Sequence, residues 1–211
     1  MDNAIKLFPD AAAAAELTED LALALLKHAD VQAETFEKVV KNRSLAKSRK
    51  VKLALVQHPK IPRHILLPLL RHLFTFDLMR VALMPIVAAD IKMAAEESLI
   101  NRLDKLSLGE KLSLARRASG RVAAALLKDA TPRVIAVALE NGRLTEARVG
   151  KELSRRDANI GLIHAVRNHP KWNVRPEIIA VLQKANAAAA WPSPEILEIK
   201  SDSSPQIPTE K

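Results

Sequence analysis

The sequence contains no cysteine and no tyrosine, and only two of its 211 residues are tryptophan. Without cysteine there can be no disulfide bond, no thiolate metal site and no cysteine nucleophile. The sequence also lacks any run of about 18 apolar residues, the length that a membrane-spanning helix needs. Residues 1–6 have neither the basic nor the apolar segment of a signal peptide. We therefore expect a cytoplasmic protein without a membrane partner.

Glycine is scarce as well, with five residues in the chain. Alanine, leucine, lysine, arginine and glutamate are abundant, and these residues favour helices. Aromatic residues, which favour strands, make up 3% of the chain. Apolar residues make up 48%, which is enough to build a core. The composition therefore predicts a nearly all-α protein and argues against a β-sandwich or an α/β enzyme.

The net charge is +9, and it is unevenly distributed. Residues 1–40 carry three basic and eight acidic side chains, whereas residues 41–80 carry ten basic side chains and one acidic. Beyond residue 80 the basic excess is smaller, and residues 187–211 are weakly acidic. A basic block of this density favours an anionic partner, although it could also be a solvated helix face.

A repeat runs along most of the chain. Residues 23–31 match residues 53–61 after a shift of 30 positions, and weaker copies follow. Each copy has a small residue at its centre, which we call its anchor residue, at positions 24, 54, 82, 113, 138 and 165. The steps between these positions predict a repeat of about 28 residues, which fits two short helices and two turns.

The copy at residues 53–70 illustrates the unit. A first helix is predicted to end near His58, a proline-containing turn follows, and a second helix begins at about Pro62. Neither helix can bury its apolar stripe alone, so the units must stack and share a core. This predicts an α-solenoid, or α–α superhelix, of about six two-helix repeats.

The expected boundaries are a lead-in at 1–16, one repeat domain at 17–186 and a flexible tail at 187–211. Within the domain, Pro68 and Pro85 fall inside apolar helical patterns, so we expect a kink or a break at each. Ser107, three residues before Glu110, has the spacing of a capping box. Asp30 is an expected N-cap residue.

The repeat unit resembles HEAT-like repeats and the leucine-rich repeat variant of bacterial proteins. The shared pattern is a small residue and leucine in the first helix, then His/Asn-Pro, then proline or valine and Ile-x-x-x-Leu in the second helix, over roughly residues 20–185. Residues 106–146 are also similar to uncharacterised bacterial helical-repeat proteins. The resemblance implies a helical superhelix. Leucine-rich repeat variant proteins can carry an iron–sulfur cluster, which this cysteine-free chain cannot bind.

Three histidines, at positions 28, 58 and 169, each lie four residues after an anchor residue. At the end of a helix, an imidazole can bond the terminal carbonyls and interact favourably with the helix dipole. A metal site would need several histidine nitrogens converging on one ion. We interpret these histidines as capping residues and predict no metal site and no cofactor.

The sequence contains no paired nucleophile and base, no facing carboxylate pair and no phosphate-binding loop. We therefore predict no catalytic residues. One enzymatic alternative follows from the resemblance, because HEAT-like alkylpurine DNA glycosylases use aromatic, acidic and arginine side chains in a basic groove. Trp172, Asp157 and Arg175 would be that set here, although a tryptophan in such a turn more often fills the space between repeats.

The candidate binding residues are basic side chains that recur along the repeats. They are Lys41, Arg43, Lys47, Arg49, Lys50, Lys52, Arg116, Arg117, Arg121, Arg155 and Arg156. Our leading hypothesis is a monomeric, non-enzymatic scaffold that binds an acidic protein partner through a basic concave surface. The alternative is a protein that binds the DNA or RNA backbone, with few aromatic residues for base stacking.

Overall fold

The computed structural model describes residues 17–189, and within that range the chain is all-helical, with no strand. Its twelve α-helices are α2 (Glu19–Leu25), α3 (Ala33–Lys41), α4 (Arg49–Gln57), α5 (Arg63–Leu70), α6 (Thr75–Leu83), α7 (Ala89–Ile100), α8 (Leu108–Arg117), α9 (Gly120–Leu126), α10 (Pro132–Leu139), α11 (Glu146–Leu153), α12 (Ile160–Arg167) and α13 (Pro176–Ala189). Two short 3-10 helices, η2 (Leu45–Lys47) and η3 (Leu103–Lys105), lie between them.

The expected lead-in at 1–16 and most of the expected tail lie outside the described residues. The expected tail includes residues 187–189, but these residues form the end of α13. The run of alanines there favours continuation of the helix, because alanine has the highest helix propensity.

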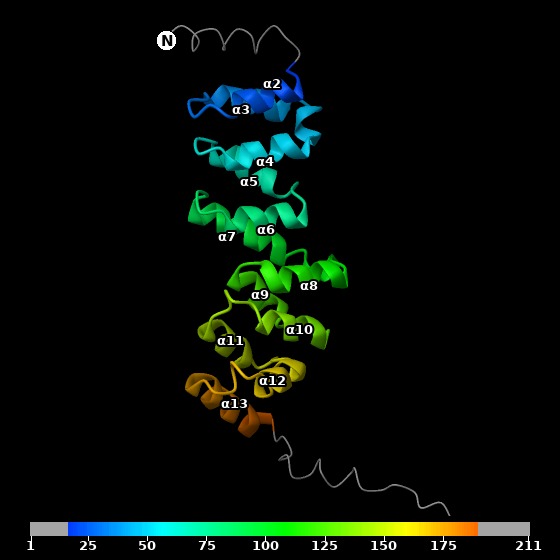
Figure 1. Ribbon diagram of the computed structural model, residues 1–211, viewed down its shortest axis with the longest axis vertical. Helices are drawn as coiled ribbons and strands as arrows, with labels where there is room; N and C mark the ends of the chain where they lie inside the picture. The colour runs from blue at the N-terminus through cyan, green and yellow to red at the C-terminus, as the bar shows by residue number, and fades with distance from the viewer. Residues whose placement is uncertain (1–16, 190–211) are drawn as a thin grey trace, which may run out of the picture.

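The helices follow one another in pairs along the long axis of the molecule (Figure 1). The first helices of the pairs are α2, α4, α6, α8, α10 and α12, and we call them the first layer. The second helices are α3, α5, α7, α9, α11 and α13, and we call them the second layer. Within the first layer α2 contacts α4, α4 contacts α6, α8 contacts α10 and α10 contacts α12. In the second layer every successive pair is in contact from α3 to α13.

The anchor residues identify the first layer. They are Ala24, Ala54, Ala82, Ser113, Ala138 and Ala165, and each lies in a different first-layer helix. A small side chain lets neighbouring helices approach closely where they pack. The sequence positions that defined the period therefore mark equivalent places in six successive helix pairs.

Apolar side chains from both layers form one continuous core. Leu55 of α4, Leu70 of α5 and Leu99 of α7 are almost completely buried. Trp172, which precedes α13, is also buried in this core. Full burial of one such side chain contributes about 1.5–3 kcal/mol relative to exposure. Because each short helix has only a few of these residues, it depends on the neighbouring pairs for its stability.

Hydrogen bonds between neighbouring units join residues about one repeat apart. The side chain of Asn159 donates to the carbonyl of Asp129, 30 residues earlier, at 3.0 Å. Arg102 donates to the carbonyl of Leu73, 29 residues earlier, at 2.7 Å. The accepting carbonyls lie in the turns that follow α9 and α5, where no helix supplies a hydrogen-bond donor.

The predicted helix breaks and helix caps are present at some positions and absent at others. The capping box at Ser107 and Glu110 is confirmed. Helix α6 ends before Pro85, as expected for a break, but Pro68 lies inside α5 and does not end it. The expected cap at Asp30 is wrong, because Gln32 is the N-cap of α3. The carboxylate of Asp30 instead contacts the ammonium of Lys60 in the next unit at 2.5 Å.

Candidate functional site

The two layers differ in charge. The first-layer helices carry nine basic and four acidic residues, and two of the four acidic residues lie in the terminal helix α2. The second-layer helices carry eight of each. The basic excess of the helical region is therefore confined to one layer, which gives that side of the stack a positive potential.

In the second layer, several charged side chains form ion pairs between neighbouring pairs of helices. These contacts are Arg63 with Asp90 at 3.2 Å, Arg121 with Glu96 at 3.7 Å and with Glu97, and Lys128, which follows α9, with Glu152 at 3.4 Å. Ion pairs at the surface contribute little to stability one by one. Other charged residues of this layer, such as Arg148 and Lys151 of α11, have no ion-pair partner among residues 17–189.

In the first layer, four exposed arginines have no such partner. Among residues 17–189, no carboxylate lies within ion-pair distance of Arg80 in α6, Arg116 and Arg117 in α8, or Arg133 in α10. A guanidinium group has five N–H donors in a planar fork and stays protonated at neutral pH. These four side chains can therefore bind carboxylate or phosphate oxygens without first losing a partner.

A hollow of about 600 Å³ lies beside α6, and we call it the α4–α6 hollow. Most of its lining is apolar and comes from Phe76, Met79, Leu83, Met84 and Pro85. Arg49, Asp77 and Arg80 complete the lining. Aromatic residues, methionine and arginine are the types enriched in the centres of protein–protein interfaces.

Within this hollow, Arg49 of α4 is held by Asp77 of α6. Two hydrogen bonds join the guanidinium to the carboxylate, at 2.8 and 2.7 Å. The Asp77 side chain is 3% exposed, and the Arg49 side chain is 60% exposed. The hydrogen bonds to Asp77 and its charge raise the pKa of Arg49. The guanidinium also lies over the ring of Phe74, with 5.7 Å between the guanidinium carbon and the ring centroid.

A second hollow, of about 400 Å³, lies between α8 and α10, and we call it the α8–α10 hollow. Its lining residues are Leu112, Ser113, Arg116, Arg117, Arg133 and Val137. Three of the four unpaired arginines therefore line this hollow, together with one serine and two apolar residues. No acidic side chain belongs to this lining.

The eleven expected binding residues are distributed over both layers and the connections between helices. Five of them lie in first-layer helices, namely Arg49, Lys50, Lys52, Arg116 and Arg117. Lys41 and Arg121 lie in the second layer, and each is paired with carboxylates there. Arg43 and Lys47 lie between α3 and α4, in or beside η2. The dense block in the sequence is therefore spread over both layers and the connection between them.

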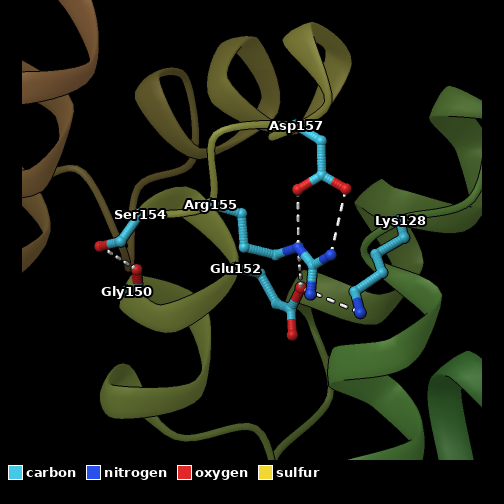
Figure 2. Close-up of polar contacts among 6 residues, drawn as sticks. All are labelled: Lys128, Gly150, Glu152, Ser154, Arg155 and Asp157. Carbon is cyan, nitrogen blue, oxygen red and sulfur yellow. Dashed lines mark hydrogen bonds and ion pairs between the residues drawn. The ribbon is translucent and has the colours of Figure 1, made fainter.

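Arg155 and Arg156 follow α11, and Arg155 belongs to the polar cluster in Figure 2. Its guanidinium contacts both carboxylate oxygens of Asp157 at 3.0 Å and lies 3.8 Å from Glu152. Lys128 approaches Glu152 from the end of α9. Two cations thus balance two carboxylates, and the cluster links α9, α11 and the turn before α12.

The residues of the glycosylase alternative each have a different partner. The pKa of Asp157 is lowered by the hydrogen bond from Arg155. Arg175 lies 3.9 Å from Glu146. Trp172 is 2% exposed, and its indole N–H donates to the carbonyl of Leu139 at 2.9 Å. A buried indole ring cannot stack on a nucleobase, and here it fills the space between two units.

His58 is the C-cap residue of α4, and both of its ring nitrogens have partners. Nδ1 accepts from the backbone N–H of Lys60 at 3.1 Å, so Nε2 carries the proton and donates to the carbonyl of His28 at 2.9 Å. The bonded carbonyl belongs to the preceding unit and not to α4. His169 repeats part of this pattern, because its Nδ1 accepts from the N–H of Lys171 at 3.2 Å.

Two first-layer arginines, Arg80 and Arg133, were missed by the sequence reasoning. A comparison of the units position by position could have found them. Arg80 lies two residues before its anchor residue, as Lys52 does, and Arg133 lies five residues before its anchor residue, as Arg49 does. Isolated arginines do not stand out in a search for dense basic runs, whereas their repeated position is visible once the units are aligned.

Residues 17–189 contain no group of three or more histidine, aspartate or glutamate side chains that could hold a metal ion. In the same range, no helix combines the length and the hydropathy required to cross a bilayer. The chain matches no family model, no curated protein and no solved structure.

Proposed function

We propose that this chain is a non-enzymatic α-solenoid of about six HEAT-like repeats, and that its first layer binds an acidic segment of a partner protein. The observation that carries the proposal is that both hollows lie on the first layer and combine arginine with apolar side chains. The basic excess of that layer would attract the partner over a distance. The apolar walls would bury its hydrophobic side chains.

The lining of the hollows favours a protein segment over a nucleic-acid backbone. Phosphate contacts need cationic and hydrogen-bonding groups, and they make no use of an apolar wall. The α4–α6 hollow offers mainly apolar side chains, and Phe74 beside it is 63% exposed. Such a surface gains most from a partner that has both carboxylates and apolar side chains.

A backbone-reading DNA or RNA protein is the second candidate. The observation in its favour is that basic residues recur in every first-layer helix from α4 to α12. A row of cations along an elongated stack could follow a chain of phosphates. This candidate predicts binding that weakens steeply with salt and that does not depend on the apolar lining.

A capture experiment tests the proposal. The full chain would be immobilised and exposed to nuclease-treated lysate, and the bound proteins would be quantified by mass spectrometry. We expect a partner that is lost when Arg80 and Arg133 are both changed to glutamate. The matched control changes Arg148 and Lys151 of α11 to glutamate, because these exposed cations belong to the second layer. Capture should survive that change.

The apolar contribution is tested separately by Phe76→Ser and Met79→Ser, which alter the α4–α6 hollow without changing its charge. Loss of the same partner would support a protein segment. If capture of the partner falls equally when Arg80 and Arg133 are reversed and when Arg148 and Lys151 are reversed, the binding surface is not specific to the first layer. Tight, salt-sensitive binding of generic duplex DNA that is abolished by the Arg80 and Arg133 reversals would favour the second candidate instead.

A further inference from the structure

The α8–α10 hollow combines features that an exposed basic helix face does not require. Three arginines line the same small hollow together with Ser113, and no carboxylate belongs to the lining. Within residues 17–189, no carboxylate lies within ion-pair distance of any of the three guanidinium groups. Like charges that line one hollow repel one another, so an anion that binds there would relieve this repulsion.

The position of Arg133 gives a second, independent reason to expect an anion. Arg133 is the second residue of α10, directly after Pro132. The N-terminus of a helix carries partial positive charge, so a cation there is unfavourable unless an anion compensates it. Arg116 and Arg117 lie in the last turn of α8, where the helix dipole favours a cation. The dipole thus accounts for the arginines of α8 but not for Arg133.

We infer that the α8–α10 hollow binds a phosphoryl group carried by a segment of the partner protein, as on phosphoserine or phosphothreonine. A planar carboxylate has two oxygens, and one guanidinium fork already satisfies them. A phosphoryl group has three terminal oxygens and nearly two negative charges, so it can accept from several guanidinium groups at once. Arginines from two helices, together with a hydroxyl donor, suit this shape and charge.

The apolar part of the lining argues for a peptide and not for free phosphate. Leu112 and Val137 flank the arginines and are partly buried against the core. A free ion would make no contact with such side chains, whereas the residues beside a phosphorylated serine could cover them. This inference rests on the proposed function, since it names the chemistry that the first layer would recognise.

Fluorescence anisotropy with the full chain tests the inference. The probe is a short labelled peptide that contains one phosphoserine and is otherwise uncharged, and the same peptide with serine or glutamate at that position serves for comparison. We expect the phosphopeptide to bind about ten-fold more tightly than either, because several charge-assisted hydrogen bonds are gained. Arg133→Gln should weaken binding of the phosphopeptide by about ten-fold, and Arg133→Lys by less, because lysine keeps the charge without the fork.

Arg148→Gln in α11 is the matched control, since it removes one exposed positive charge from the second layer. Its binding should change by less than about two-fold, the size expected from long-range charge alone. Arg116→Gln and Arg117→Gln provide two further variants at exposed positions of α8. All variants should keep the helical circular dichroism of the parent chain.

Several results of the binding assay would overturn the inference. They are equal binding of the phosphoserine and serine peptides, equal losses from Arg133→Gln and Arg148→Gln, and inorganic phosphate competing as strongly as the phosphopeptide. Preferential binding of duplex DNA that depends on Arg133 would also overturn it. If the capture of a partner still depends on Arg80 and Arg133 after phosphatase treatment of the lysate, the inference fails while the proposed function stands.

Discussion

At the scale of single residues, equivalent positions in neighbouring units often contact each other. Arg49 and Asp77 each lie five residues before an anchor residue, and they form the bidentate pair beside the α4–α6 hollow. Lys60 and Asp30 each lie six residues after an anchor residue, and they also form an ion pair. When one repeat position carries a basic residue in one unit and an acidic residue in the next, stacking of the units can bring these two side chains together as an ion pair.

The pair of Arg49 and Asp77 predicts an asymmetric response to mutation. Arg49→Met leaves a buried carboxylate without its partner, whereas Asp77→Ala leaves a guanidinium that is largely in water. An uncompensated buried charge is the costlier of the two. We expect Arg49→Met to lower the free energy of unfolding more than Asp77→Ala, as measured by urea denaturation. The double variant should lose less than the sum of the two single changes, and strict additivity would argue against the pair.

Gly120 predicts another residue-level effect, because a backbone passes close to it. It is the first residue of α9, and a Cβ atom added there would overlap the carbonyl of Arg143. Backbone cannot move aside as a flexible side chain can, so Gly120→Ala should destabilise the protein by about 1–3 kcal/mol. Gly109 in α8 has open space around it and serves as the control. Gly109→Ala should stabilise by about 0.5 kcal/mol in the same denaturation assay.

At the scale of elements, α8 is tied to the connection between α9 and α10. The ammonium of Lys111 lies 2.8 Å from the Asp129 carboxylate, and both side chains are largely buried. The same carboxylate accepts from the backbone N–H of Thr131 at 2.8 Å. Burial raises the pKa of Asp129, but the hydrogen bonds from Lys111 and Thr131 outweigh it, and the net effect is a lowered pKa.

This lowered pKa predicts a pH dependence of stability. The unfolded chain binds a proton at Asp129 near its ordinary pKa of about 4, while the folded chain keeps the carboxylate ionised to lower pH. The stabilising contribution of ionised Asp129 to folding is therefore present above about pH 4, and it is lost as the pH falls through the pKa of Asp129 in the folded chain. In Asp129→Asn, the free energy of unfolding should fall less steeply with acidification. Asp104→Asn, at an exposed position, should follow the parent chain.

At the scale of the whole molecule, the main contacts of each helix pair within residues 17–189 are with its neighbours in the stack. Stability in such an arrangement is close to a sum of units and the interfaces between them. The α8–α10 hollow is itself a product of one interface, because its lining comes from helices of two successive units. A change at one interface should therefore loosen its own end of the molecule more than the other.

Trp172 tests this locality. Its buried indole bonds to Leu139 at the end of α10, 33 residues earlier. Trp172→Ala should cost about 3–5 kcal/mol locally, as for other large buried aromatic residues. In hydrogen exchange, we expect faster exchange in α10 to α13 and little change in α4 to α7. Uniform loss of protection along the chain would show that the stack unfolds as a single cooperative unit instead.

Much of the helical arrangement was predictable from local sequence. The period near 28 follows from small residues and leucines that recur along the chain, and Ser107 with Glu110 specifies a helix start by a bond within four residues. Local rules failed where the decisive partner lay one unit away. Asp30 contacts Lys60 in place of capping α3, and His58 bonds a carbonyl of the preceding unit.

The candidate surface was decided by tertiary structure. The sequence by itself determined that the chain is basic and helical, because charge and helix propensity are properties of residues. Only packing of the helices into two layers separated paired from unpaired cations. It placed Arg121 beside Glu96 and Glu97, and it brought Arg133 to Arg116 across the α8–α10 hollow. Ion pairing depends on distances between atoms, and stacking sets those distances between residues that lie far apart in the sequence.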